Sequence, residues 1–176
     1  ARAKTARKKL EGIHAEELDL QQIRNLRTRI IELYHYVAEN APFNTFFLAD
    51  HHFESMKEHL ADNFRIFGYF SGDELIGFYT LILNHGDIDT YFLGYDKELQ
   101  KPRQLYLNML LDMVEFGIRQ HCKRIIFGRT ALEIKSTVGA VPVEIVGLIR
   151  HNHPVVNLFM KKAFSSVSPK MEWIQR

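Results

Sequence analysis

Two short turns divide the middle of the sequence into three stretches that suit β-strands. The turns lie at 71–73 (Ser-Gly-Asp) and 84–87 (Asn-His-Gly-Asp), and they separate the stretches Phe64–Phe70, Leu75–Leu83 and Ile88–Tyr95. The middle stretch is an almost unbroken apolar run, which is typical of a strand covered on both faces. Because turns this short join antiparallel neighbours, the sequence predicts an antiparallel meander.

The strongest helical pattern follows this meander. It begins at Leu105 and runs to about His121, and its apolar face comprises Leu107, Leu110, Leu111, Val114 and Ile118. A short strand is predicted next, at Arg124–Phe127. A long helix between two strands is a crossover, so the second strand can run parallel to the first. The fold class predicted is therefore α/β, with an α+β mixed sheet.

Weaker patterns complete the order of elements. Apolar residues at three- and four-residue steps predict a helix from about Leu20 to Glu39, and a shorter helix fits Phe53–Leu60. After the crossover, one or two helical turns are predicted at Glu133–Val138 and a strand at Val143–Arg150. Pro154 stands where the last helix begins.

Composition limits the class of protein. The chain has 176 residues, 46% of them hydrophobic and 25% charged, which suits one globular domain rather than a disordered chain. Cys122 is the only cysteine, so no internal disulfide forms, and we expect a reducing, cytoplasmic setting. No apolar run approaches the ~20 residues of a membrane span. A net charge of +2 argues against DNA binding.

The first residues form a basic segment. Residues 1–9 carry Arg2, Lys4, Arg7, Lys8 and Lys9 without an acid, and the first residue is Ala rather than Met. We expect residues 1–15 to be a linker or arm, residues 16–176 to be one domain, and an upstream part to be missing. The arm is either a solvated segment or a contact for phosphate or RNA.

The order of elements resembles that of the Gcn5-related N-acetyltransferase (GNAT) superfamily over most of residues 16–168. In that fold a meander continues into a crossover helix, and the acyl donor lies where the strands before and after this helix splay apart. The resemblance implies a GNAT-like acyltransferase fold that uses acyl-CoA.

Three local patterns resemble a narrower group, the FemAB-type aminoacyltransferases and related peptidoglycan biosynthesis/recognition proteins. These patterns are the basic segment followed by Gly12-Ile13, the stretch 33–43, and Phe127-Gly128-Arg129-Thr130 with Lys135 and Gly139-Ala140. The resemblance implies the C-terminal module of a two-module protein whose N-terminal GNAT-like module is absent. It also implies aminoacyl-tRNA as an alternative donor.

The segment before the crossover helix departs from the usual acetyl-CoA loop. Gln100 matches, but Arg103 and Leu105 stand in place of glycines, and Pro102 removes a backbone donor. Lys101 and Arg103 lie directly before the predicted helix N-terminus. They form either a solvated loop or an anion clamp on the donor.

A second group of candidates follows the strand that ends at Phe127. Gly128 would allow backbone to approach a ligand, and Arg129 and Lys135 come after it, where ligands collect in open α/β sheets. The alternative is that Arg129 pairs with an acid and that Lys135 is exposed. With Gln100, Lys101 and Arg103, these residues are the predicted donor-binding set.

Acid–base chemistry is assigned to the third strand of the meander. Alternation would place Asp89, Tyr91, Leu93 and Tyr95 on one face. We assign Asp89 as the base that takes the proton of an attacking amine and Tyr95 as the acid. The nine histidines form no metal-binding motif, and no metal is expected. Cys122 is interpreted as structural.

The function predicted is N-acyl transfer, in which an amine attacks the carbonyl of an acyl or aminoacyl donor. The protein would position the reactants and supply an oxyanion donor from the splayed backbone. The alternative is a catalytically silent GNAT-fold partner that recognises substrate within a two-module protein. A third interpretation is RNA binding through residues 1–9.

Overall fold

The computed structural model describes residues 2–41, 44, 46–146 and 148–167. The chain divides into two compact units, residues 1–129 and residues 130–176. The first unit contains the sheet.

The sheet has five strands in the order β1-β2-β3-β4-β5. They are β1 (Ile13–Glu17), β2 (Phe64–Ser71), β3 (Glu74–Asn84), β4 (Asp87–Tyr95) and β5 (Arg124–Ile126). The pairs from β1 to β4 are antiparallel, whereas β4 and β5 are parallel. The predicted meander and crossover are therefore confirmed. β1 was not predicted, because its polar, mostly exposed residues carry no strand signal, and it begins inside residues 1–15, the predicted linker.

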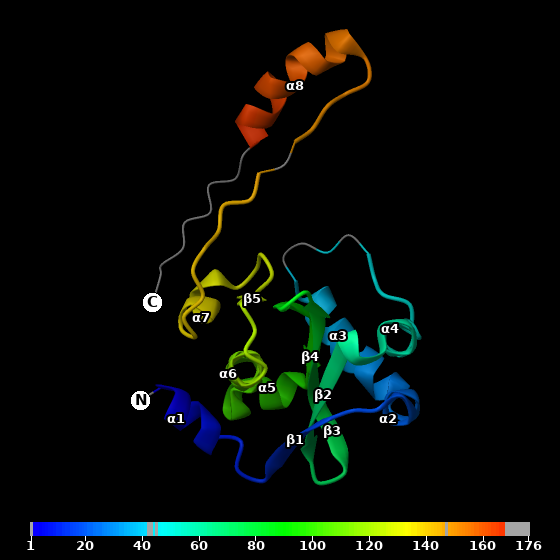
Figure 1. Cartoon of the computed structure of the whole chain (residues 1–176), viewed down its shortest axis with the longest axis vertical. Coiled ribbons are helices and arrows are strands. Elements are labelled where there is room, and N and C mark those ends of the chain that lie inside the picture. The colour runs from blue at the N-terminus through cyan, green and yellow to red at the C-terminus, as the bar shows by residue number, and fades with distance from the viewer. Residues whose placement is uncertain (1, 42–43, 45, 147, 168–176) are drawn as a thin grey trace. The chain divides into compact units, whose positions relative to one another are not determined.

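Two helical layers cover the sheet of the first unit (Figure 1). One layer contains α2 (Leu20–Asn25), α3 (Arg27–Glu39) and α4 (His52–Leu60), with the short η1 (Ala61–Asn63) after it. The other layer contains α1 (Arg2–Lys8), α5 (Lys97–Arg103) and the crossover helix α6 (Leu105–Arg119). The helix predicted from Leu20 to Glu39 is thus two helices that meet at Leu26.

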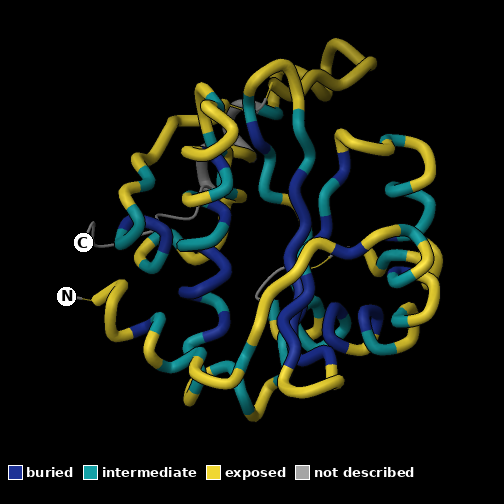
Figure 2. The backbone as a smooth tube through the Cα atoms, turned by 60° about the horizontal axis from the view of Figure 1, so that its bottom comes forward, coloured by how far each residue is buried: buried dark blue, intermediate teal, exposed yellow. Residues whose placement is uncertain are grey.

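The apolar core lies between the sheet and the layer of α2, α3 and α4. Buried side chains from these helices and from β2 and β3 form one cluster, which includes Ile23, Ile30, Phe53, Ile66 and Phe78. Among the strands, the interior β2 and β3 carry most of the buried residues, and β1 is exposed (Figure 2). Burial of this area is the main stabilising contribution to the fold.

The basic segment at the start of the chain is held against α6. Ala6 is fully buried, and its carbonyl oxygen accepts a hydrogen bond from Asn108 Nδ2 at 3.0 Å. Arg7 forms ion pairs with Asp112 and Glu115 of α6. Asp112 also accepts a hydrogen bond from the hydroxyl of Tyr69 on β2. This segment is therefore a packed helix and not a free arm, although Arg2, Lys4 and Lys8 are exposed.

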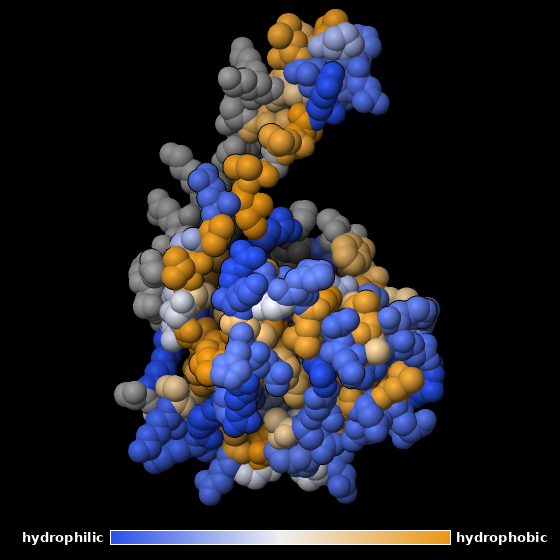
Figure 3. Space-filling view, viewed as in Figure 1, coloured by the Kyte–Doolittle hydropathy of each residue, from blue (hydrophilic) through white to orange (hydrophobic). Residues whose placement is uncertain are grey.

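The second unit contains α7 (Leu132–Ser136) and α8 (Pro154–Val167). The described residues of 143–150, all but 147, form no strand, so that prediction is wrong. A strand needs a hydrogen-bonded neighbour, and the described residues provide none for this segment. Apolar side chains gather on the surface of this unit, and Leu148 is 97% exposed (Figure 3). No described helix is long and apolar enough to cross a membrane.

At Gly94 the backbone of β4 lies directly against the backbone of α3. A Cβ atom there would lie 2.5 Å from the carbonyl carbon and 2.7 Å from the carbonyl oxygen of Leu33 on α3. No real Cβ atom tolerates such distances to backbone, so only glycine allows α3 to lie directly on this strand.

Gly94→Ala is expected to lower the free energy of unfolding by about 2–3 kcal/mol, because α3 or β4 must move. The matched control is Gly77→Ala on β3, where the nearest atom is the flexible methyl of Met109. We expect the control to cost less than about 1 kcal/mol. Urea unfolding followed by circular dichroism measures both, and equal losses would contradict the close packing of α3 on β4.

Candidate functional site

β4 and β5 run side by side for only a short distance and then part. Their parallel register pairs Asp87 with Arg124, Ile88 with Ile125 and Asp89 with Ile126. Thr90 Oγ1 then donates a hydrogen bond to the carbonyl oxygen of Ile126 at 3.1 Å. β5 ends there, while β4 continues to Tyr95. The predicted parting of the strands around the crossover helix is confirmed, and it leaves Tyr91–Tyr95 with no strand on this edge among the described residues.

A β-bulge marks the point of parting. On β3 and β4, Leu81 pairs with Thr90 and Tyr79 pairs with Leu93, so Tyr91 and Phe92 together lie opposite Thr80. The buried hydroxyl of Thr80 accepts a hydrogen bond from Phe92 N at 2.9 Å and donates one to Phe92 O at 2.7 Å. A side chain thus replaces the strand partner that the bulge removes. Bulges bend strands, so this one turns the second half of β4 away from the direction of β5.

The bulge also changes which face of the sheet each side chain occupies. Ile88 faces α6, where a Cβ atom at Gly117 would lie 3.4 Å from its Cδ1. Without a bulge Phe92 would face the same way, but its ring lies 5.5 Å from that of Tyr34 on α3. The alternation predicted from Asp89 to Tyr95 is therefore wrong. Asp89 and Tyr91 lie on the face of α3 and α4, whereas Tyr95 packs against Tyr106 of α6.

Three tyrosines meet at the free edge of β4. The ring of Tyr95 lies 5.9 Å from that of Tyr36 on α3 and 6.3 Å from that of Tyr106 on α6. None of their hydroxyls forms a hydrogen bond with another described residue. Burial raises the pKa of Tyr95, and burial, with Tyr95 nearby, raises the pKa of Tyr106 to about 12. Both hydroxyls therefore keep their protons at neutral pH and can donate them.

A histidine and a tyrosine meet on the other face, at the bulge. His52 Nε2 lies 3.2 Å from the hydroxyl of Tyr91. Burial, and to a lesser extent neighbouring His51, lowers the pKa of His52. Sequence reasoning missed the contact of His52 and the role of Thr80. The only signal for Thr80 was that it is the one polar residue within the apolar run of β3.

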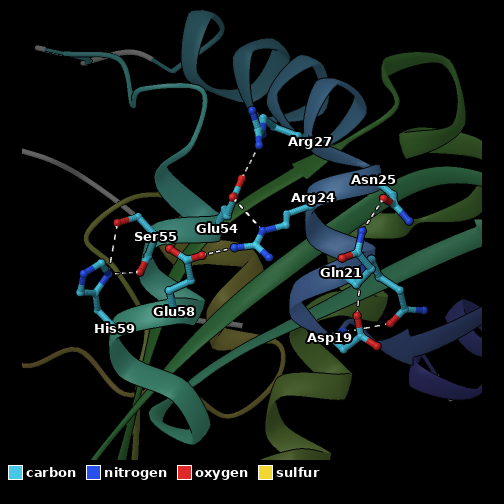
Figure 4. A network of polar contacts seen from close by, with 10 residues as sticks. Asp19, Gln21, Arg24, Asn25, Arg27, Glu54, Ser55, Glu58 and His59 are labelled. Atoms are coloured by element: carbon cyan, nitrogen blue, oxygen red, sulfur yellow. Dashed lines mark hydrogen bonds and ion pairs between the residues drawn. The ribbon is translucent and has the colours of Figure 1, made fainter.

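Ion pairs fix the helix that carries His52. Glu54 of α4 accepts hydrogen bonds from Arg24 Nε at 3.0 Å and from Arg27 at 2.6 Å (Figure 4). Arg24 also pairs with Glu58, one turn further along α4. The hydrogen bond from Arg24 is the main reason why the pKa of Glu54 is lowered. Such partly exposed pairs contribute little stability, but here they bind α4 to both α2 and α3.

The residues predicted as an anion clamp lie on a helix instead of a loop. α5 contains Gln100, Lys101 and Arg103. Its first N–H groups are capped by the carboxylate of Asp96, which accepts from Glu98 N at 2.9 Å and Leu99 N at 3.1 Å.

Of these predicted residues, Arg103 is held by hydrogen bonds, whereas Lys101 is exposed to solvent. Arg103 donates hydrogen bonds of 3.3 Å to the carbonyl oxygens of Lys9 and Glu11. Lys101 is exposed. The position of Arg103 therefore ties α5 to the segment that follows α1.

The other predicted donor-binding residues belong to different units. Gly128 and Arg129 are exposed at the end of the first unit. Lys135 lies in the second unit on α7, where it is only 7% exposed and donates a hydrogen bond to Thr130 O at 2.7 Å. Burial lowers the pKa of Lys135 to about 8. The alternative of an exposed Lys135 is therefore wrong, while its predicted role in binding a donor stays a prediction.

Metal ligands do not gather in the described residues, where no group of three His, Cys, Asp or Glu side chains could hold an ion. Asp89 is half-buried, and it forms no ion pair with another described residue. The groups available for chemistry are thus the open edge of β4, the tyrosines beside it, Asp89, and the pair of His52 and Tyr91.

Comparison with solved structures identifies the fold. The aminoglycoside N-acetyltransferase AAC(6')-Iy, in complex with CoA, matches with a TM-score of 0.57 at 12% identity over 80% of this chain and 95% of its own. The aminoglycoside acetyltransferase meta-AAC0020, from an uncultured soil metagenomic sample, in complex with sisomicin, matches with a TM-score of 0.54 at 12% identity, over 81% and 96%. The ribosomal-protein-S18-alanine N-acetyltransferase of Escherichia coli gives 0.56 at 9% identity, over 72% and 76%.

These likenesses show that the chain has the GNAT acyltransferase fold, a mixed α/β structure. The sequence itself matches no protein-family profile and none of the curated proteins. The fold predicted from the order of elements is therefore confirmed.

Thr80→Val is expected to lower the free energy of unfolding by about 2 kcal/mol, because it leaves the buried N–H and C=O of Phe92 without a partner. Thr80→Ser keeps the hydroxyl, and we expect it to lose less than about 1 kcal/mol. Chemical unfolding of the two variants checks this. If serine and valine destabilise equally, the hydroxyl does not hold the bulge.

Proposed function

We propose that this protein is an N-acyltransferase, which transfers an acyl group from a CoA thioester to a primary amine. The observation that carries the proposal is the parting of β4 from β5 after Asp89 and Ile126, with a bulge at that point. It leaves an unpaired strand edge between the two strands, and an extended donor can add to such an edge through backbone hydrogen bonds.

The open edge suits the chemistry of acyl transfer. Attack of an amine on a thioester carbonyl places negative charge on the carbonyl oxygen. Fixed N–H groups of Tyr91–Tyr95 that face the edge would stabilise this charge, because they need no reorganisation during the reaction. Holding donor and amine together removes most of the entropic cost of their encounter.

The solved structures of similar fold support this choice of reaction. AAC(6')-Iy and meta-AAC0020 are both named as acetyltransferases, the first in complex with CoA and the second with sisomicin. An acyl-CoA donor and an amine acceptor are thus the first pair to test with this protein. Whether the acceptor is an aminoglycoside, a peptide or a cell-envelope precursor is a question for a panel of amines.

The site residues predicted from the sequence enter this proposal in revised form. Tyr95 stands at the free edge with its proton and is proposed as the acid that protonates the leaving thiolate. Asp89 lies on the opposite face, and its role as the base stays a prediction. Gln100, Lys101, Gly128 and Arg129 are proposed donor contacts, and Arg103 is proposed to act while bound to the segment after α1. The role of Lys135, which belongs to the second unit, in binding a donor stays a prediction.

Two more specific alternatives belong to the same proposal. The resemblance to FemAB-type proteins implies aminoacyl-tRNA as donor and an N-terminal partner module. The other alternative is a catalytically silent module, and the helix at 97–103 favours it, because it stands where the usual acetyl-CoA loop would present free N–H groups to a diphosphate. Assays with charged tRNA distinguish the first, and donor binding without turnover distinguishes the second.

The reaction is tested by mass spectrometry of amine panels incubated with the protein and acetyl-CoA, longer acyl-CoAs or charged tRNA, with donor affinity measured by calorimetry. We expect acyl-CoA to bind and at least one amine to gain the acyl group. A protein that binds none of these donors would contradict the transferase proposal.

Tyr95→Phe is expected to lower kcat by about 10²-fold with little change in donor affinity, since it removes only the proposed acid. Tyr36→Phe removes a hydroxyl from the same cluster and serves as the control with nearly unchanged kcat. Steady-state kinetics with saturating amine measures both. Equal rates for Tyr95→Phe and the unaltered protein would show that another group protonates the thiolate.

A further inference from the structure

His52 and Tyr91 meet at the point where β4 leaves β5. Tyr91 is the first β4 residue beyond Thr90, whose side chain makes the last bond to Ile126. It is one of the two residues in the bulge, and its hydroxyl lies 3.2 Å from Nε2 of His52. Tyr91 is also 38% exposed, so a small molecule can reach it.

The surroundings of His52 favour a neutral imidazole. Its ring lies 5.4 Å from that of Phe53 and 6.3 Å from that of Phe92. Two titratable groups lie next to the His52 ring: His51, which directly precedes α4, and Tyr91 of β4. Tyr34 of α3 in turn acts on Tyr91. The carboxylates of α4 are Glu54 and Glu58, which are held by arginines of α2 and α3.

Burial therefore dominates the titration of His52 and holds its pKa below the ordinary 6.5. At neutral pH the ring is uncharged and has one nitrogen free to accept a hydrogen bond. Placing the ring proton on Nδ1 leaves Nε2 as the acceptor for the Tyr91 hydroxyl.

We propose that Tyr91 and His52 form the path by which the acceptor amine loses its proton, with Tyr91 touching the amine and His52 behind it. The inference rests on the proposed acyl transfer and assigns the base of that reaction, in place of Asp89, to a pair that sequence reasoning did not find. Asp89 shares this face of the sheet, but it makes no hydrogen bond with either ring, whereas the two rings contact one another.

The amine nitrogen forms a bond to the acyl carbon, and its N–H bond breaks as the proton moves to the Tyr91 oxygen. The Tyr91 proton moves at the same time to His52 Nε2. The C–S bond of the thioester then breaks, and the thiolate leaves with the electron pair. His52 returns its proton to solvent, the thiolate gains one, and the products are an amide and a thiol.

The test compares Tyr91→Phe and His52→Gln with the control His51→Gln, because the hydroxyl of Tyr91 pairs with His52 and not with His51. Rates at saturating acyl-CoA and limiting amine are measured from pH 5 to 9, together with acyl-CoA affinity. In the unaltered protein we expect the rate to fall as the pH drops through the pKa of His52, which lies below 6.5, because the protonated ring can no longer accept a proton. This inflection comes in addition to the one caused by protonation of the amine. Both pair variants should lose this inflection and about 10²-fold in rate, while acyl-CoA affinity stays unchanged.

A second readout does not need turnover. Nitrogen NMR of the histidine rings should show His52 with its proton on Nδ1 and a Nε2 shift that changes in Tyr91→Phe. The inference is overturned if Nε2 carries the proton, or if the pair variants keep both rate and inflection. Failure of the proposed function looks different, because the unaltered protein then transfers no acyl group at any pH.

Discussion

The hydroxyl of Thr80 makes two hydrogen bonds to the backbone of Phe92, and the arrangement of the candidate site depends on them. They satisfy a backbone N–H and C=O that the bulge deprives of a strand partner. Leaving such a backbone group buried without a partner would lower the free energy of unfolding by about 1–3 kcal/mol. The Thr80 hydroxyl supplies the missing partner and so stabilises the bulge. Because the bulge persists, β4 parts from β5, and the side chains before and after it face opposite layers of helices.

The two sides of β4 therefore differ in chemistry. On the side of α6, Tyr95 packs against Tyr106, and burial keeps its hydroxyl protonated. On the side of α3 and α4, His52 is neutral and contacts Tyr91. The proposed acid thus lies near one side of the free edge, and the proposed base lies near the other. This separation suits a reaction in which the amine enters from one side and the thiol leaves from the other.

The meander and the crossover helix were predictable, since turns at 71–73 and 84–87 and the periodicity of α6 are local signals. β1 and α1 were not, because their residues are polar and are held by contacts distant in sequence, such as Arg7 with Asp112. The segment 143–150 has a strand pattern but no strand partner among the described residues. For the site, the face of Tyr95 was mispredicted because a single bulge reverses the alternation of side chains between the two faces of β4. No residue pattern within β4 predicts this bulge. The contact between His52 and Tyr91 joins residues of α4 and β4, and it follows only from the packing of α4.

The central claim is that the free edge of β4 receives the donor. The most direct measurement is the change in backbone amide NMR shifts when acetyl-CoA is added to the protein. We predict the largest changes at Tyr91–Tyr95 and at Ile126–Gly128, the two segments on either side of the parting strands. Changes confined to other parts of the chain, with the amides of β4 unaffected at saturating acetyl-CoA, would contradict the account.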